Sequence, residues 1–260
     1  AYGALSALRR PPTDADQITR TFYDGRGNVV AELDAEGYLT EYVVDDARNA
    51  RAVLGYAKRL AGLQGNESLA TLSAQAKTGP LRETRRSFDA FGNVLVEVNP
   101  EGTVTRYTYD ADGRLLKTEA AAGTSDARVA SRRYDAFGNL TGELGDEGSS
   151  KLTALMSAAE IDAVYAQYGV RHAYDALGRR IESIDAGGNK TWYFYDGAGR
   201  LTQTVRGVAN SQGVANAEGE VTETRYTAFG DVRETITYTG RITIGTPSPG
   251  ATVALASASR

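Results

Sequence analysis

A six-residue motif recurs along the chain. Each copy has an aromatic residue, Asp, two variable residues, Gly, and Asn or Arg, as in YDADGR at 109–114. Six copies are clear, and a seventh at 226–231 has Thr in place of the Asp. Such self-similarity is typical of repeat proteins, in which each unit buries its surface against its neighbours. We therefore expect function to depend on the assembly of repeats.

The aromatic, Asp and Gly of each copy are the predicted structural motif residues. Asp at the first position of a type I turn can accept a hydrogen bond from the backbone two residues on, and a Gly with φ > 0 closes a hairpin with a bulge. The motif therefore predicts a tight turn in every repeat. The residues are Tyr23, Asp24, Gly27, Phe88, Asp89, Gly92, Tyr109, Asp110, Gly113, Tyr134, Asp135, Gly138, Tyr174, Asp175, Gly178, Tyr195, Asp196, Gly199, Tyr226 and Gly230.

The spacing of the copies adds a second set of turns. Tyr23 to Val44, Phe88 to Tyr109 and Tyr174 to Tyr195 are each 21 residues apart, and 44–49 is a degenerate copy with Arg48 at the Gly position. Further turn sequences occur at a fixed offset, at 34–37, 99–102, 185–188 and 145–148. Turn glycines thus alternate every 10 or 11 residues.

The segments between the turns read as strands. Stretches such as 93–98 (NVLVEV), 103–109 (TVTRYTY) and 189–195 (NKTWYFY) are rich in Val, Thr and aromatic residues and alternate with period two. We expect antiparallel hairpins whose equivalent aromatics lie beside one another across the sheet. In 189–195, alternation favours packing of Trp192 and Phe194 on the sheet over stacking on a sugar or partner.

Two intervals are long enough to hold helices. The sequence predicts a helix at 50–63 (ARAVLGYAKRLAGL) and a second at 69–76. A third is predicted near 157–168, where Ser157 and Glu160 form a capping box and Ile161, Val164, Tyr165 and Tyr168 share a face. The predicted division is a connection at 1–16, a hairpin array at 17–240 with helical insertions near 50–76 and 157–168, and a linker-like tail at 241–260, in which 252–255 is a candidate strand.

Composition and motifs argue against most enzyme and binding classes. The net charge is −4, with 29 basic and 33 acidic residues interspersed, which is not typical of a nucleic-acid or anionic-membrane surface. Cys is absent, and no stretch approaches the ~20 apolar residues of a membrane span. His172 is the only histidine and lacks a Ser-His signature, so it is interpreted as a strand residue rather than a base.

The motif Asp residues are interpreted as turn caps rather than calcium ligands, because EF-hand and nonapeptide calcium patterns are absent from the sequence. The glycines at 25–27 and 197–199 lack the context of a phosphate loop. Cross-strand pairs with acidic residues such as Glu97 or Glu182 are expected for two sets of arginines. Arg106, Arg133 and Arg225 lie in strands that lead into motifs, and Arg114, Arg179 and Arg200 follow turn glycines. No catalytic, cofactor-binding or metal-binding residue is predicted.

The sequences YDADGRLL (109–116), YDALGRRI (174–181) and YDGAGRLT (195–202) resemble the YD-repeat, or rearrangement-hotspot (Rhs), family. The resemblance covers roughly residues 17 to 240. It implies a mostly β fold, in which antiparallel hairpins form a spiralling sheet, here with short helical insertions. Family members include Rhs toxins, insecticidal toxin-complex shells and teneurins, and in the toxins the sheet encloses a C-terminal effector. This chain has no Asp-Pro pair of the kind found in the closing motif of toxin-bearing members.

The leading hypothesis is a non-enzymatic structural segment of a large bacterial secreted or surface protein, part of a shell or scaffold. Its expected partners are neighbouring repeats, an enclosed C-terminal polypeptide or further copies of itself, without nucleic acid, cofactor or membrane span. The opening sequence, which lacks an initiator Met, is interpreted as that of a segment of a larger protein. The alternative is an extracellular fibre or adhesin segment that binds itself, a surface or a glycan. A hydrolase is a third hypothesis, because carboxylates are plentiful.

Overall fold

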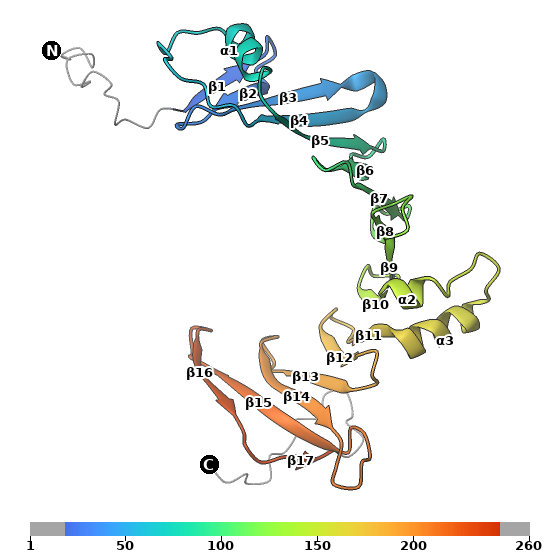
Figure 1. The fold of residues 1–260 in the computed structure, drawn as a ribbon. Helices are drawn as coiled ribbons and strands as arrows, with labels where there is room; N and C mark the ends of the chain where they lie inside the picture. The colour runs from blue at the N-terminus through green and yellow to red at the C-terminus, as the bar shows by residue number, and fades with distance from the viewer. Residues whose placement is uncertain (1–18, 245–260) are drawn as a thin grey trace, which may run out of the picture. The chain divides into compact units, whose positions relative to one another are not determined.

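The computed structural model describes residues 19–244 (Figure 1). Within this range the protein is mostly β, with seventeen strands and three short α-helices. The described chain divides into two compact units. The first contains residues 19–107 and 121–124, and the second contains residues 108–120 and 125–244.

The first unit is a meander in which each strand pairs antiparallel with the next, from β1 to β7. A single 3-10 turn at Asp46–Arg48 connects β3 to β4, and helix α1 (Leu69–Ala76) lies between β4 and β5. The strands are β1 (Arg20–Tyr23), β2 (Val29–Leu33), β3 (Leu39–Asp45), β4 (Ala50–Tyr56), β5 (Leu81–Phe88), β6 (Val94–Val98) and β7 (Val104–Tyr109), whose last two residues belong to the second unit.

The second unit continues the same pattern, with antiparallel pairs from β8–β9 to β15–β16 and a further β15–β17 pair. Helices α2 (Asp146–Ser149) and α3 (Ala158–Tyr168) lie between β10 and β11. The strands are β8 (Leu115–Ala120), β9 (Arg128–Tyr134), β10 (Leu140–Leu144), β11 (Gly169–Tyr174), β12 (Arg180–Ile184), β13 (Lys190–Tyr195), β14 (Leu201–Val208), β15 (Glu218–Tyr226), β16 (Val232–Thr237) and β17 (Ile242–Thr243).

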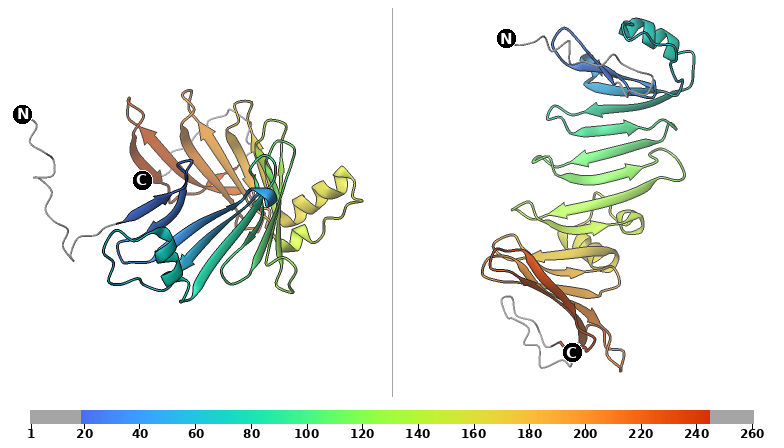
Figure 2. Two further views of the ribbon diagram at one scale, coloured as in Figure 1. Left: turned by 90° about the horizontal axis from the view of Figure 1, so that it is seen from above. Right: turned by 90° about the vertical axis from the view of Figure 1, so that its left-hand side faces the viewer.

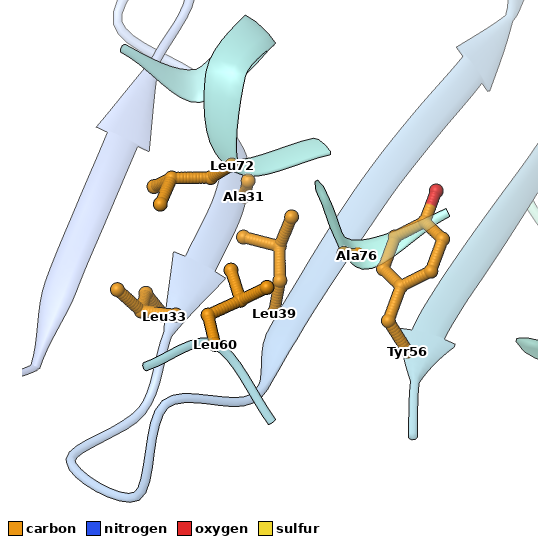
Figure 3. Packing of buried hydrophobic residues seen from close by; sticks show 7 residues of the cluster. All are labelled: Ala31, Leu33, Leu39, Tyr56, Leu60, Leu72 and Ala76. Carbon is orange, nitrogen blue, oxygen red and sulfur yellow. The ribbon is translucent and has the colours of Figure 1, made fainter. Parts of the chain in front are cut away.

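Helix α1 covers one face of the first sheet. Leu39 and Leu72 are fully buried, and with Tyr56 and Leu60 they form a cluster between helix and strands (Figure 3). The helix begins where the Ser68 side chain accepts a hydrogen bond from the Thr71 backbone N–H. Because a thin sheet buries little apolar surface alone, this helix supplies a local core.

Helix α3 covers the second sheet at β10 and β11 (yellow in Figure 2). Its predicted capping box is present, with Ser157 and Glu160 bonding each other's backbone N–H groups. Tyr165 packs on Gly142, where an added Cβ would lie 2.7 Å from the ring. Val164, Tyr165 and Leu144 are buried, and Ile161 and Tyr168 pack against them, so the predicted helical face is confirmed.

A third cluster lies within the sheet of the second unit. Trp192, Val205 and Val221 occupy facing positions on three neighbouring strands and are buried. Phe194 packs against them, so the predicted sheet-packing role of Trp192 and Phe194 is confirmed.

Three sequence-based expectations differ from the structure. The helix predicted at 50–63 is wrong, because 50–56 forms β4 and pairs along its length with both β3 and β5. The segment after β4 runs over the 34–37 turn, where the Leu60 N–H donates to the Gly37 carbonyl at 2.8 Å. Two ladders of backbone hydrogen bonds outweigh a helical preference based on Ala, Leu and Arg.

The turn expected at 145–148 is instead the start of α2, where Gly145 has no side chain to cap a turn. The expected tail at 241–260 begins with β17, which pairs with β15. The candidate strand at 252–255 lies outside the described residues.

Candidate functional site: the YD turns and the links between repeats

Each motif Asp organises its own turn. In the turn after β7, Asp110 Oδ1 accepts hydrogen bonds from the backbone N–H groups of Asp112 (3.0 Å) and Arg114 (2.9 Å). The Asp110 N–H donates to the Arg114 carbonyl at 3.0 Å, and the Gly113 N–H donates to the Asp110 carbonyl at 3.1 Å. Gly113 has φ of 79°, in the left-handed region that favours glycine. The Asp110 side chain and the Gly113 conformation thus allow the backbone groups of the turn to form hydrogen bonds.

The same geometry holds in all six clear copies, whose turn glycines have φ between 74° and 89°. In the degenerate seventh copy, Thr227 Oγ1 accepts from the Asp231 N–H at 3.2 Å, and Gly230 has φ of 93°. The motif aromatic is in every copy the last residue of its strand: Tyr23, Phe88, Tyr109, Tyr134, Tyr174, Tyr195 and Tyr226.

The same turn type also occurs outside the motif. Asp34, Asn99 and Asp185 each accept from the backbone N–H four residues on, as the spacing predicts. Asn210 does so as well, in the connection between β14 and β15. The signal for Asn210 is Gly213 three residues later, with φ of 78°.

The residue after the turn glycine holds the Asp carboxylate. Where it is Asn, as at Asn139, the side-chain amide donates to Asp135 Oδ2 at 2.9 Å and, against the effect of burial, keeps the pKa of Asp135 below its ordinary value. Where it is Arg, as at Arg200, its backbone N–H and then its guanidinium lower the pKa of Asp196. At neutral pH these carboxylates are therefore charged and hydrogen-bonded within their own turns.

Four motif tyrosines link their own repeat to the preceding one. In the second unit, the Tyr195 hydroxyl donates to the Arg180 carbonyl at 2.8 Å. Three further tyrosines make the same contact, always to the residue two positions after the preceding turn glycine: Tyr134 to Leu115 at 3.1 Å, Tyr174 to Leu140 at 2.8 Å, and Tyr226 to Leu201 at 2.8 Å. Hydrogen bonds from tyrosine hydroxyls to backbone carbonyls therefore connect these repeats. The sequence predicted only that equivalent aromatic side chains lie beside one another.

Arginine adds a second link. Arg200 pairs with Asp196 at 2.7 Å, and its guanidinium lies over the ring of Tyr226, 4.8 Å from the centroid. The next-motif ring is covered in the same way by Arg179 over Tyr195 at 4.8 Å and by Arg114 over Tyr134 at 5.4 Å. A desolvated cation over an aromatic face is stabilising, and pairing with the Asp fixes the guanidinium there.

The cross-strand pairs expected for Arg114, Arg179 and Arg200 are therefore wrong, whereas Arg225 does pair across the strands, with Glu234 at 3.0 Å. Arg114, Arg179 and Arg200 pair within their own turns, whereas Glu97 pairs with Arg86 and Glu182 with Lys190. Alternation along a strand shows which side chains share a face of the sheet. The register between strands decides which cation lies opposite which anion, and the sequence does not show that register.

The degenerate copy in the first unit uses a different link. Asn49, which occupies the position after the replaced glycine, has φ of 45°. Its side-chain amide donates to the carbonyls of Phe88 (3.1 Å) and Asp89 (2.7 Å) in the next motif. The link between repeats thus survives the loss of the turn glycine.

His172, the one histidine of the sequence, lies in β11 and contacts the neighbouring strand. His172 Nδ1 lies 2.9 Å from Ser183 Oγ on the neighbouring strand, and burial, followed by the charge of Arg180, lowers its pKa. Between residues 19 and 244 there is no group of three or more His, Asp or Glu side chains arranged to hold a metal ion. Over the same range, no helix has the length and apolar character needed to cross a membrane.

Comparison with known proteins agrees with this geometry. A family model described as RHS Repeat matches residues 88–125 and 174–210. Curated protein sequences give no match.

Among solved structures, the crystal structure of TcdB2-TccC3 without its hypervariable C-terminal region has a TM-score of 0.56 and 15% identity, covering 91% of this chain and 11% of that chain. The crystal structure of TcdB2-TccC3 has a TM-score of 0.48 and 16% identity, covering 84% and 12%. The Tc holotoxin pore of Photorhabdus luminescens has a TM-score of 0.45 and 13% identity, covering 85% and 12%.

At 15% identity the first of these shows similarity of fold, and the chain spans only 11% of that solved chain's length. The repeated turn, the antiparallel hairpins and the two family-model matches point to the same conclusion. The resemblance to the YD-repeat family is confirmed: this chain carries Rhs repeats and has a mostly β fold similar to that of TcdB2-TccC3.

Proposed function

We propose that this chain is a non-enzymatic wall segment of a bacterial secreted or surface protein, and that the wall encloses a polypeptide. The observation that carries the proposal is the link from repeat to repeat. In the second unit, motif tyrosines bond the preceding hairpin at four successive places, in addition to the backbone ladders.

Such a sheet suits a barrier. Paired strands lie about 4.8 Å apart, which leaves no opening for a folded protein or an extended chain. The charged side chains of the motif are used in their own turns, and the described residues contain no metal cluster. A structural role therefore accounts for the repeated residues, and the crystal structure of TcdB2-TccC3 without its hypervariable C-terminal region has a similar fold. Enclosure of a cargo and export from the cell are part of the proposal.

Electron microscopy of the longest natural polypeptide that contains this sequence tests the proposal. Closed hollow particles are expected, together with a fragment that resists added protease until the particle is opened by denaturant. Protease treatment of intact cells, with a cytoplasmic protein as the control, tests the location. Solid particles whose entire chain is cleaved at once would contradict enclosure.

A fibre or adhesin segment is the second candidate. It is favoured by the large apolar side chains that several turns expose, including Phe91 and Phe137. Filaments or open curved strips in the same micrographs would support this function instead.

A further inference from the structure

Strand β17 begins where the repeat calls for a strand, but it pairs with a different partner. In the three 21-residue units, the residue 16 positions after the motif aromatic starts a strand and pairs with the residue 10 positions after that aromatic. The pairs are Leu39 with Leu33, Val104 with Val98 and Lys190 with Ile184. Ile242 holds the same position after Tyr226, so the repeat predicts it opposite Ile236. In the structure it lies opposite Gly219 of β15 instead.

The residues just before β17 have the sequence of a hairpin turn. The segment 237–241 reads TYTGR, with glycine in the fourth place and arginine in the fifth, as in the YD turns that end in Gly-Arg. Its first residue, Thr237, follows Tyr226 by 11 residues. The first residue of each regular second turn follows its motif aromatic by the same interval: Asp34, Asn99 and Asp185. Sequence and spacing therefore both predict a hairpin between β16 and β17.

Threonine can make the side-chain contact of such a turn. In the turn after β15, Thr227 Oγ1 accepts a hydrogen bond from the Asp231 backbone N–H at 3.2 Å. The segment 145–148 has Gly145 in this place, with no side chain to accept a bond, and it starts a helix instead. Because Thr237 has the hydroxyl that Gly145 lacks, a turn at 237–240 is available to this chain.

In the structure the segment is a bulge rather than a turn. Strands β16 and β17 both pair with β15, on the side away from β14 (Figure 1). Between them, residues 238–241 lie against only two residues of β15, 220–221. Gly240 does not have the positive φ of the motif-turn glycines. The extra residues interrupt the ladder of backbone hydrogen bonds along β15.

The pairing of β17 with β15 is short. It consists of two residue pairs, whereas the matching hairpin of β12 and β13 has three. Arg241 adds ion pairs with Glu218 at 3.4 Å and with Glu220 at 3.7 Å, but its side chain is 50% exposed. Exposed ion pairs contribute little to stability. Backbone pairing therefore gives β17 no strong preference for β15 over β16.

Both pairings place the same side chains on the same face of the sheet. Ile242 packs against the buried cluster that includes Val221. Ile236 lies opposite Glu223, which is two residues from Val221, so Ile236 shares this face. If β17 moved from β15 to β16, Ile242 would lie beside Ile236 and stay on the apolar face. The move therefore avoids the reversal of faces that a one-residue slip causes.

We propose that β17 is a switch strand, which exchanges between the edge of β15 and a repeat hairpin with β16. The exchange decides which strand lies next to β16. When β17 pairs with β16, it adds a strand to the meander, and a further strand can then pair with β17. This switch belongs to the second unit and is independent of whether the wall encloses a cargo.

Competition between two disulfides measures the exchange. The chain has no Cys, so Glu218→Cys/Thr235→Cys/Thr243→Cys offers the thiol at 243 two partners. Position 218 lies opposite 243 in the structure, and 235 lies opposite 243 in the hairpin, by the register that pairs Ser183 with Thr191. Directly opposite residues are within disulfide reach. In a glutathione buffer the disulfides exchange, and peptide mapping gives their ratio. Both are expected, with 218–243 in excess.

Changes in the turn sequence should shift this ratio in opposite directions. Thr237→Asp supplies the acceptor of the motif, and a shift of about tenfold toward the 235–243 disulfide is expected. Thr237→Val, the matched control, has no acceptor and should give no such shift. Gly240→Ala should shift the ratio about fivefold or more toward 218–243, because only the hairpin needs a positive φ at 240.

The same oxidation in denaturant gives the ratio for the unfolded chain. A 235–243 disulfide that forms only in denaturant would overturn the proposal, because the hairpin would then be absent from the folded protein. Exclusive formation of 235–243 under native conditions would also overturn it, since β17 would not visit β15. Equal ratios in Thr237→Asp and Thr237→Val would show that 237–240 does not act as a turn.

Discussion

The hydroxyl of Tyr195 lies 2.8 Å from the carbonyl oxygen of Arg180, two residues past the glycine of the preceding YD turn. This hydrogen bond joins the aromatic residue of one motif to the strand that follows the glycine of the preceding motif. The aromatic ends one strand, and the turn glycine determines where the next strand begins and which carbonyl faces the hydroxyl. The donor and acceptor meet in all four links although 15 to 34 residues separate them in the sequence, so the turn and the strand that follows it, and not a fixed interval between motifs, bring them together.

Replacing Tyr195 by Phe tests the value of this link. The change keeps the ring beneath Arg179 but removes the hydroxyl donor, which leaves the half-buried Arg180 carbonyl without this bond. We expect the free energy of unfolding to fall by about 1 kcal/mol. Chemical denaturation measures it, with Tyr23→Phe, an exposed motif tyrosine in the first unit, as the control. Equal losses of unfolding free energy in both variants would show that the Tyr195 hydroxyl contributes no more than the hydroxyl of an exposed tyrosine.

The two glycines of the turn after β13 make a matched pair. Gly199 has φ of +80°, whereas Gly197 has no positive φ, and neither has an atom closer than 3.9 Å to an added Cβ. Gly199→Ala is expected to cost about 1–2 kcal/mol through the left-handed backbone alone. Gly197→Ala is expected to be neutral or to stabilise by a few tenths of a kcal/mol. Thermal unfolding compares them, and similar melting temperatures would refute the backbone explanation.

Sequence patterns predicted the turns and hairpins because both depend on local chemistry. Asp110 and Gly113 determine one turn whatever surrounds them, and Ser157 with Glu160 starts α3 in the same way. The 50–56 segment was misread as helix because its strand conformation depends on partners on both edges. The Tyr195 link was missed because its acceptor is a backbone carbonyl, which carries no residue signature.

The contact of Arg200 with Tyr226 predicts a coupling energy. Arg200→Asn keeps a side chain that can cap Asp196, as Asn139 does for Asp135, but it removes the cation over the Tyr226 ring. A double-mutant cycle with Tyr226→Leu is expected to give about 0.5–1 kcal/mol of coupling. Arg233→Asn, an exposed change on β16, serves as the control cycle. Coupling equal to that control would assign the Arg200 effect to its turn alone.

His172 predicts how stability varies with pH near neutrality, because it is the only histidine in the chain. Burial, followed by the charge of Arg180, lowers its pKa in the folded protein. The unfolded chain, with an ordinary pKa of about 6.5, then binds a proton at a pH where the folded chain does not. Stability is therefore complete above about pH 6.5 and falls as pH drops below it. Melting temperatures measured between about pH 8 and pH 5.5 should decline in the parent chain. In His172→Gln they should stay nearly level, since the carboxylates titrate mainly at lower pH. A decline of equal size in the variant would show that another group causes it.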